Sequence, residues 1–380
     1  MNKPIEEPAE ESTGSKDRFW IPRFWDGMNL TAWGSLLVRN RMAIAPRRCA
    51  TAAVTTALAP VNSSLGAIQA IGFGRRIART ELVGDPIFVI GHWRTGTTLL
   101  HELLGLDPRH AYPDTYACFA PNHFLLSGRW LRPALGVLLP SRRPIDNMAA
   151  GWDRPQEDEF AMCNLGARSP YLSLVFPNRA AQDQEYFELA DVGPRSLARW
   201  KRSFRWFLKC VTLQTGKRIV LKSPTHTFRI KVLVEMFPEA RFVHVVRNPW
   251  AVFPSTVKLW KRLARDQGVQ VPRHEGLHGQ VFSTLQRMHE VFQRDRKLID
   301  PSCLCEVRYE DLVDDMIGQT RAIYEHLGLG EFDSVLPALE RYAAENKDYR
   351  ANRHEISPKI RGEISRRWAR YAEEYGYSAP

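Results

Sequence analysis

The feature that most constrains the fold lies at residues 86–106, where a short apolar run leads into a glycine-bounded loop. Residues 86–90 (PIFVI) have the composition of a short buried strand, and residues 99–106 (LLHELLGL) have that of a helix. Gly91 and Gly96 bracket the four residues between them, and two threonines follow. A strand, a glycine loop and a helix in this order open an α/β unit, so the sequence predicts parallel strands joined through helices.

The same alternation continues along the chain. Further buried strands are predicted at 218–222, 241–246 and 303–307, and helices from 195, over 225–237, from 249, over 312–327 and over 357–375. Strands that alternate with helices predict a parallel sheet with helices on both faces. We therefore expect an α/β fold, a P-loop-like parallel sheet flanked by helices, with a helical N-terminal extension.

The loop GHWRTGTT at residues 91–98 has the length of a P-loop, but Thr97 stands where a P-loop has its lysine. Backbone N–H groups at the start of a helix that follows a strand bind oxyanions. Thr97 and Thr98 add hydroxyl donors, and Arg94 adds a positive charge. The loop therefore predicts a site for one phosphate-like group rather than a triphosphate. The alternative is a turn that only connects the strand to the helix.

Basic residues follow two more of the predicted strands. Lys222 and His226 lie in KSPTH, directly after the strand at 218–222. Arg247 follows the strand at 241–246, and Ser255 lies about two helical turns farther on. Ligands of open α/β sheets bind at the carboxyl ends of the strands, so these residues should share one edge with the glycine loop. Arg247 and Ser255 suit a second phosphate, although Arg247 could equally pair with a carboxylate.

Together these residues resemble the sulfotransferase family that uses 3′-phosphoadenosine 5′-phosphosulfate. The loop WRTGTT resembles the family's 5′-phosphosulfate loop, with the basic position at Arg94 and the oxyanion-binding positions at Thr95, Gly96, Thr97 and Thr98. The run VRNPWAVFPS resembles the 3′-phosphate motif, with Arg247 and Ser255 at its phosphate-binding positions. The likeness is to the broad bacterial-type branch and spans roughly residues 85–375.

The resemblance implies in-line transfer of a sulfuryl group from this co-substrate to a hydroxyl or amine, without a metal. It implies His226 as general base, with Lys222 and Arg94 stabilising charge. Three residues separate Lys222 from His226, whereas one does in the usual cytosolic pattern. The alternative base is Glu157 or Glu159, which the sequence does not separate. These acids also fit the first turn of a helix capped by Asp153.

The sequence divides into three parts. Residues 1–17 are acidic and polar, and we expect them to be a disordered tail. Residues 18–84 form the helical extension, and residues 85–380 form the sulfotransferase domain. Within it, residues 107–194 are rich in proline and lack a sustained period, so we expect an insertion that binds the acceptor. The acceptor could be a small molecule, a glycan or a lipid.

The net charge of +11 is concentrated in two segments. Residues 195–231 contain 11 lysines and arginines and no acid, and residues 18–80 contain nine arginines and one acid. Residues 49–74 carry no charge, yet they are too polar for a confident membrane-spanning helix. We expect a pair of helices packed on the main domain, with a helical hairpin at a membrane surface as the alternative. The expected location is the cytoplasm, with peripheral membrane contact through residues 18–80 left open.

Two other functions stay open on the sequence. A P-loop nucleotide kinase or NTPase needs the loop lysine and a strand that ends in aspartate, whereas the strands here end at Lys222 and Arg247. A non-catalytic basic protein that binds membranes or nucleic acid would use the charge alone. We expect no nucleic-acid partner, because the sequence contains no zinc finger, RNP-type aromatic motif or helix-turn-helix signature.

Overall fold

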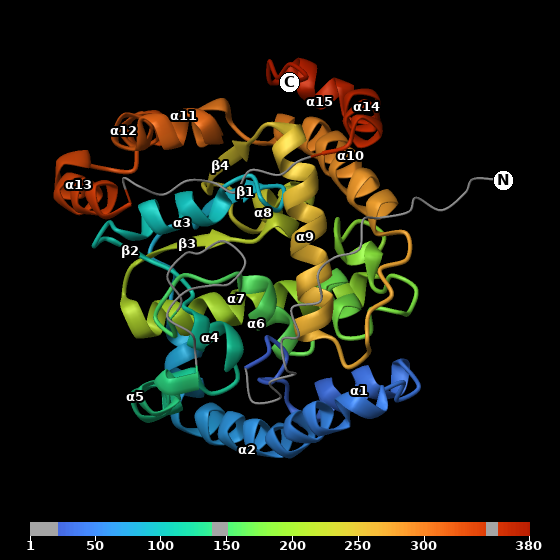
Figure 1. Cartoon of the computed structure of the whole chain (residues 1–380). Helices are drawn as coiled ribbons and strands as arrows, with labels where there is room; N and C mark the ends of the chain where they lie inside the picture. The colour runs from blue at the N-terminus through green and yellow to red at the C-terminus, as the bar shows by residue number, and fades with distance from the viewer. Residues whose placement is uncertain (1–21, 139–150, 347–355) are drawn as a thin grey trace.

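A five-stranded, all-parallel sheet lies at the centre of the protein (Figure 1). The computed structural model describes residues 22–138, 151–346 and 356–380, so the predicted tail at 1–17 lies outside the described residues. The strand order is β2-β3-β1-β4-β5. The strands are β1 (Ile87–Gly91), β2 (His110–Ala111), β3 (Arg218–Lys222), β4 (Arg241–Val246) and β5 (Leu304–Arg308). The predicted α/β fold class is confirmed.

Helices precede, connect and follow these strands. They are α1 (Leu30–Arg39), α2 (Cys49–Arg79), α3 (Thr97–Gly105), α4 (Thr115–Phe119), α5 (Phe124–Ala134), α6 (Asp158–Asn164), α7 (Pro194–Thr215), α8 (Ile230–Met236), α9 (Pro249–Gln267), α10 (Leu277–Asp295), α11 (Tyr309–Asp314), α12 (Met316–Leu327), α13 (Leu336–Glu345), α14 (Pro358–Arg367) and α15 (Ala369–Glu374). Short 3-10 turns include η3 (Pro170–Leu174) and η5 (Pro224–Phe228).

The two faces of the sheet bury different helices. Ile87 and Val89 of β1 share a core cluster with residues of α3 and α12. Phe88 and Ile90, whose side chains point the opposite way, share another cluster with residues of α7 and α8. Because both faces are covered, β1 is apolar along its whole length instead of alternating.

The N-terminal extension is built into the body of the protein. The indole of Trp25 stacks on that of Trp33 with ring centroids 5.1 Å apart, and both belong to a core cluster that also contains Phe176 and Phe228. The uncharged stretch at 49–74 forms part of one helix, α2, which continues through Pro60. The expectation of two helices for this stretch was therefore wrong, although α1 and α2 together form a helical pair.

Two further differences from the predictions affect the site. The predicted helix at 225–237 is divided at Arg229 into the 3-10 turn η5 and helix α8. Residues 107–194, which show no period in the sequence, contain the short helices α4, α5 and α6. Over the described ranges, no helix combines the length and the hydropathy needed to cross a bilayer.

Candidate active site

The register of the strands brings the predicted site residues to one edge of the sheet. Val89 of β1 lies opposite Lys222, the last residue of β3. Gly91, the last residue of β1, lies opposite Val245 of β4, so Arg247 leaves the sheet two residues later. The loop after β1, the KSPTH segment after β3 and the start of α9 after β4 thus begin within a few residues of one another, as predicted from the rule for parallel sheets.

Backbone conformation shapes the glycine loop. Gly96 has a φ of +100° and directly precedes α3. A Cβ atom at position 96 would lie 2.2 Å from Cδ2 of Tyr309, so this position accepts only glycine without a shift of that ring. Arg94 also has a positive φ, of 71°. At the other end, the backbone N–H of Gly91 donates to Oγ1 of Thr227 over 2.8 Å, which ties the loop to η5.

The two predicted anion motifs contact each other directly. Nε of Arg94 donates to Oγ of Ser255 over 2.9 Å. A guanidinium nitrogen of Arg247 donates to the carbonyl oxygen of Arg94 over 3.0 Å, and its carbon lies 4.0 Å from the ring centroid of Tyr309. Thr95 is buried and donates its hydroxyl to a carbonyl within the loop. Cationic side chains, hydroxyls and the first N–H groups of α3 therefore lie close together, and these are the kinds of donor that bind oxyanions in proteins.

Three consecutive acids at the start of α6 meet the segment that follows β3. Nζ of Lys222 lies 2.7 Å from Oε1 of Glu157. Asp158 accepts a hydrogen bond from Oγ of Ser223 over 3.1 Å, and its other oxygen lies 2.8 Å from Nε2 of His226. Two segments about 65 residues apart in the sequence are thus joined side chain to side chain.

The third acid, Glu159, is held by a buried arginine. Its carboxylate accepts hydrogen bonds from Arg229 over 2.5 and 3.0 Å, from Ser169 over 2.5 Å and from Thr225 over 3.0 Å. Burial alone would raise the pKa of Glu159, but the charge and hydrogen bonds of Arg229 outweigh it and hold the pKa below its ordinary value. Glu159 is therefore an ionised, fully satisfied group in the interior.

Glu157 has a different environment from its two neighbours. Its Oε2 accepts a hydrogen bond from the hydroxyl of Tyr171 over 2.5 Å, and that hydroxyl accepts one from Nε1 of Trp93 over 2.8 Å. Burial raises the pKa of Tyr171 well above its usual value, and the charge of Glu157 raises it further, so the phenol stays protonated and donates. The Glu157 side chain is 15% exposed and that of Lys222 is 4% exposed.

His226 and Glu159 lie too deep to meet a substrate in this conformation, because the side chain of each is 0% exposed. The imidazole of His226 sits between the rings of Phe88 and Phe204, with centroids 5.3 and 5.6 Å away. Among the described residues, its Nδ1 has no hydrogen-bond partner. Of the three candidate bases, only Glu157 has a side chain that is partly exposed to solvent.

The predicted start of the helix was wrong. Asp153 was expected to cap it, but α6 begins at Asp158, and Glu157 occupies the N-cap position without a side-chain capping bond. The acids are held by hydrogen-bond partners that lie at the end of β3 and in the segment that follows it. Sequence reasoning also missed Tyr171 and Tyr309. Tyr171 lies in a segment without a readable pattern, whereas Tyr309 directly follows a predicted strand and could have been found by that position.

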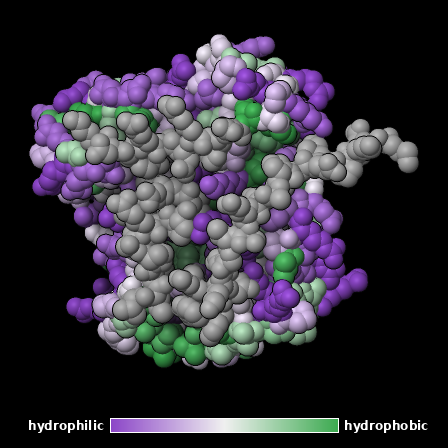
Figure 2. All heavy atoms as spheres, in the orientation of Figure 1, coloured by the Kyte–Doolittle hydropathy of each residue, from purple (hydrophilic) through white to green (hydrophobic). Residues whose placement is uncertain are grey.

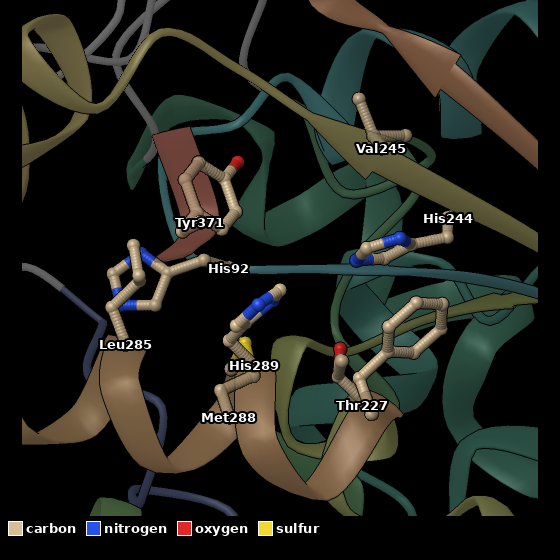
Figure 3. Close-up of a pocket in the computed structure, with 9 residues that line it drawn as sticks. His92, Thr227, His244, Val245, Leu285, Met288, His289 and Tyr371 are labelled. Atoms are coloured by element: carbon tan, nitrogen blue, oxygen red, sulfur yellow. The ribbon is translucent and has the colours of Figure 1, made fainter. Parts of the chain in front are cut away.

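A small pocket lies behind the glycine loop (Figure 3). The imidazoles of His92, His244 and His289 line it together with apolar side chains and Tyr371. Burial lowers the pKa of His92 to about 4, and burial together with the neighbouring His244 lowers that of His289 to about 4. The hydroxyl of Tyr371 exchanges 3.1 Å hydrogen bonds with the backbone N–H and carbonyl of Arg247. The pocket walls thus support the loop and Arg247 from behind.

Comparison with known proteins gives a consistent result. Residues 86–334 match the sulfotransferase family. The chain is 46% identical over 363 residues to the ω-hydroxy-β-dihydromenaquinone-9 sulfotransferase Stf3 of Mycobacterium bovis, covering 96% of this chain and 93% of that protein. Stf3 of Mycobacterium tuberculosis matches with the same identity and coverage.

Solved structures of low sequence identity share the fold. The sulfotransferase STF9 from Mycobacterium avium superposes with a TM-score of 0.68 at 18% identity, covering 92% of this chain and 93% of that one. The sulfotransferase STF1 from Mycobacterium tuberculosis H37Rv superposes with a TM-score of 0.56 at 21% identity, covering 89% of this chain and 91% of that one. The likeness extends over the N-terminal extension as well as the sheet.

Proposed function

The chain belongs to the sulfotransferase family, and we propose that it transfers the sulfuryl group of 3′-phosphoadenosine 5′-phosphosulfate to the ω-hydroxyl of a lipid quinone. The observation that carries this proposal is the 46% identity, over 96% of the chain, to sulfotransferases named for ω-hydroxy-β-dihydromenaquinone-9. Identity at this level along nearly the whole length covers the acceptor-binding parts of the enzyme as well as the donor loop.

The residues present fit the donor. It carries one charged group at the ribose 3′ position and another at the 5′ position, and two groups of residues at the sheet edge suit these charges. The N–H groups and hydroxyls of residues 95–98, at the start of α3, suit the 5′-phosphosulfate. Arg247 and Ser255 suit the 3′-phosphate. The contact between Arg94 and Ser255 supports this assignment, because it places the two predicted motifs side by side.

The chemistry that these side chains support is removal of the acceptor proton with compensation of charge. We assign the base to Glu157, because its carboxylate alone among the candidates is partly exposed, and its partner Tyr171 fixes its orientation. As the acceptor oxygen bonds to sulfur, its proton passes to Glu157, while the bond between sulfur and the bridging oxygen of the donor breaks. Lys222 and Arg94 provide positive charge near the oxygen that takes the electron pair.

His226 and Glu159 then act as positioning residues. Each anchors one end of the contact between α6 and the KSPTH segment, His226 through Asp158 and Glu159 through Arg229. Residues 107–194 provide both Glu157 and Tyr171, which supports the earlier interpretation of this region as the acceptor-binding part. A transferase that works by positioning and electrostatics needs such rigid support for its reacting groups.

Labelled sulfuryl transfer tests the proposal. We expect transfer to ω-hydroxy-β-dihydromenaquinone-9 and none to the same lipid without its ω-hydroxyl group. Adenosine 3′,5′-bisphosphate should raise the melting temperature, and ATP should not. No transfer to the hydroxylated lipid, together with transfer to a sterol or a glycan, would overturn the acceptor. Stabilisation by ATP alone would overturn the donor and favour the P-loop NTPase that the sequence left open.

A further inference from the structure

Helix α2 departs from the usual amphipathic arrangement, because its buried face is largely polar. Thr51, Thr55, Asn62 and Gln69 are buried there beside Ala52, Ala59 and Ile77. Asn62 donates to the carbonyl oxygens of Asp26 and Met28 over 2.8 and 3.1 Å. Oε1 of Gln69 accepts two backbone N–H bonds from the start of α5, and Thr55 donates to the carboxylate of Asp26 over 2.5 Å. These hydrogen bonds help to hold α2 to the body, together with small apolar residues such as Ala52 and Ala59 that pack in a core cluster.

Over residues 49–74 the opposite face of α2 is uncharged, largely apolar and open to solvent, with Ser64 as an exposed polar residue on it. Leu58 is 38% exposed, Val61 50%, Ile68 52% and Ile71 87%. The spacings of three and seven residues place these side chains on one side of the helix. We call them the α2 outer face. Figure 2 shows hydrophobic residues gathered along the lower rim of the molecule, where α2 runs in Figure 1.

The α2 outer face differs from the surface of an ordinary helix in a globular protein. Residues 49–74 contain no charged side chain, although the outward side of a surface helix normally carries the charges. The helix has 31 residues and is about 46 Å long, but it lacks the hydropathy to cross a bilayer. The exposed aliphatic residues, from Leu58 to Ile71, extend over about 20 Å of it. An apolar band on a helix that cannot span fits a helix that lies in the plane of a membrane surface.

The charges around this band identify the partner. Residues 27–80 contain seven arginines and no acid. Exposed arginines lie on both sides of the uncharged band, at Arg41 and Arg47 before it and at Arg75, Arg76 and Arg79 after it. An anionic surface complements this pattern at both ends. A second copy of the chain does not, because a symmetric pairing through α2 would bring arginines together without an acid between them.

We propose that the α2 outer face docks the enzyme on the surface of an anionic lipid bilayer. The four aliphatic side chains enter the boundary between headgroups and acyl chains, and the flanking arginines contact lipid phosphates. The proposal rests on the burial pattern and charges of residues 27–80 and does not need a lipid acceptor. If the acceptor is a lipid quinone, docking also brings the enzyme to the phase that holds its substrate.

Vesicle flotation of the full chain tests this docking. The probe is a vesicle of phosphatidylcholine with roughly 30 mol% phosphatidylglycerol, compared with phosphatidylcholine alone. We expect the wild-type protein to float with the anionic vesicles and the double variant Ile68→Glu/Ile71→Glu to bind at least about 10-fold more weakly. The matched control is Val271→Glu/Leu298→Glu, since these residues are 54% and 50% exposed but lie outside α2. We expect it to bind like the wild type.

Three outcomes would overturn the proposal. The first is that the wild-type protein fails to float with anionic vesicles, and the second is that both double variants lose binding equally. The third is that the wild-type protein sediments as a dimer and the Ile68→Glu/Ile71→Glu variant as a monomer. That result would assign the α2 outer face to contact with a second copy of the chain. Donor binding measured with adenosine 3′,5′-bisphosphate should be equal in all variants, so loss of docking is distinguishable from loss of the active site.

Discussion

Replacement of Glu157 by glutamine tests the assignment of the base most directly. The carboxylate accepts Lys222 on Oε1 over 2.7 Å and Tyr171 on Oε2 over 2.5 Å. An amide has one acceptor oxygen, so it can satisfy only one of these two donors, and its nitrogen then faces the other. The amide also cannot take a proton from the acceptor hydroxyl.

This geometry predicts the size of two effects of Glu157→Gln, the loss of kcat and the loss of folding stability. A positioned general base contributes about 10²- to 10⁴-fold in rate, so kcat should fall by that factor, which corresponds to roughly 2.7–5.5 kcal/mol of barrier. One unsatisfied donor costs about 1–3 kcal/mol of folding stability, so the melting temperature should fall but the protein should stay folded. Adenosine 3′,5′-bisphosphate should bind within about threefold of wild type, because Glu157 is not part of the donor site.

The assay is steady-state transfer of labelled sulfuryl groups, with the bisphosphate affinity measured in parallel by calorimetry. Tyr171→Phe is the matched control, since it removes one hydrogen bond to Glu157 and keeps the carboxylate. We expect it to lower kcat by about 3- to 10-fold. If Glu157→Gln kept kcat within threefold of wild type while His226→Gln folded, bound the bisphosphate and lost activity, the base would be His226 and the reasoning would be refuted.

Four further expectations follow from the structure. Arg247→Ala should weaken adenosine 3′,5′-bisphosphate binding about 10- to 100-fold in calorimetry but change AMP binding less than threefold; equal losses would contradict a 3′-phosphate role. Gly96→Ala should abolish stabilisation by the bisphosphate, because its Cβ would lie 2.2 Å from an aromatic ring atom at a φ of +100°; retained binding would show that the loop adjusts. Arg229→Met should cost about 3–5 kcal/mol in denaturant unfolding by leaving Glu159 buried and unpaired, and a second change, Glu159→Gln, should recover part of it. Burial lowers the pKa of His92 from 6.5 to about 4 in the folded state, so the unfolded chain binds the proton first and stability is lost as pH falls from about 6.5 toward 4. Because of this group, the free energy of unfolding at pH 5 should be about 2 kcal/mol lower than at pH 7. His92→Gln should reduce that difference.

The sheet and its functional edge could be predicted because they depend on local patterns. Strands buried on both faces are rich in apolar residues: β1 is a continuous apolar run, and β4 is apolar apart from Arg241 and His244. Parallel strands place their carboxyl ends together, so the convergence of the glycine loop, Lys222 and Arg247 follows once the strands are recognised. The contact of Arg94 with Ser255 was not predicted, because the position of a side chain two turns into α9 does not follow from the strands alone.

The acids of α6 could not be placed from the sequence for a different reason. Their partners lie about 65 residues away, and 3-10 turns followed by the long helix α7 connect the two. No periodicity relates Glu157 to Lys222 or Glu159 to Arg229. Acidic residues in the first turn of a helix therefore explained the same sequence equally well. For residues 49–74 the sequence predicted a pair of helices, whereas the structure has one helix, which continues through Pro60 and buries Asn62 and Gln69.

The three consecutive acids show how burial separates residues of the same chemical type. Asp158 and Glu159 are fully buried, and such burial is tolerated only when each carboxylate has close partners. Those partners come from the segment that begins with Lys222, so the two inner pairs set the register between α6 and the end of β3. With that register fixed, Glu157 has to lie beside Lys222 at the sheet edge. The proposed base is therefore positioned by buried groups, and Arg229→Met should lower kcat as well as stability even though Arg229 is completely enclosed.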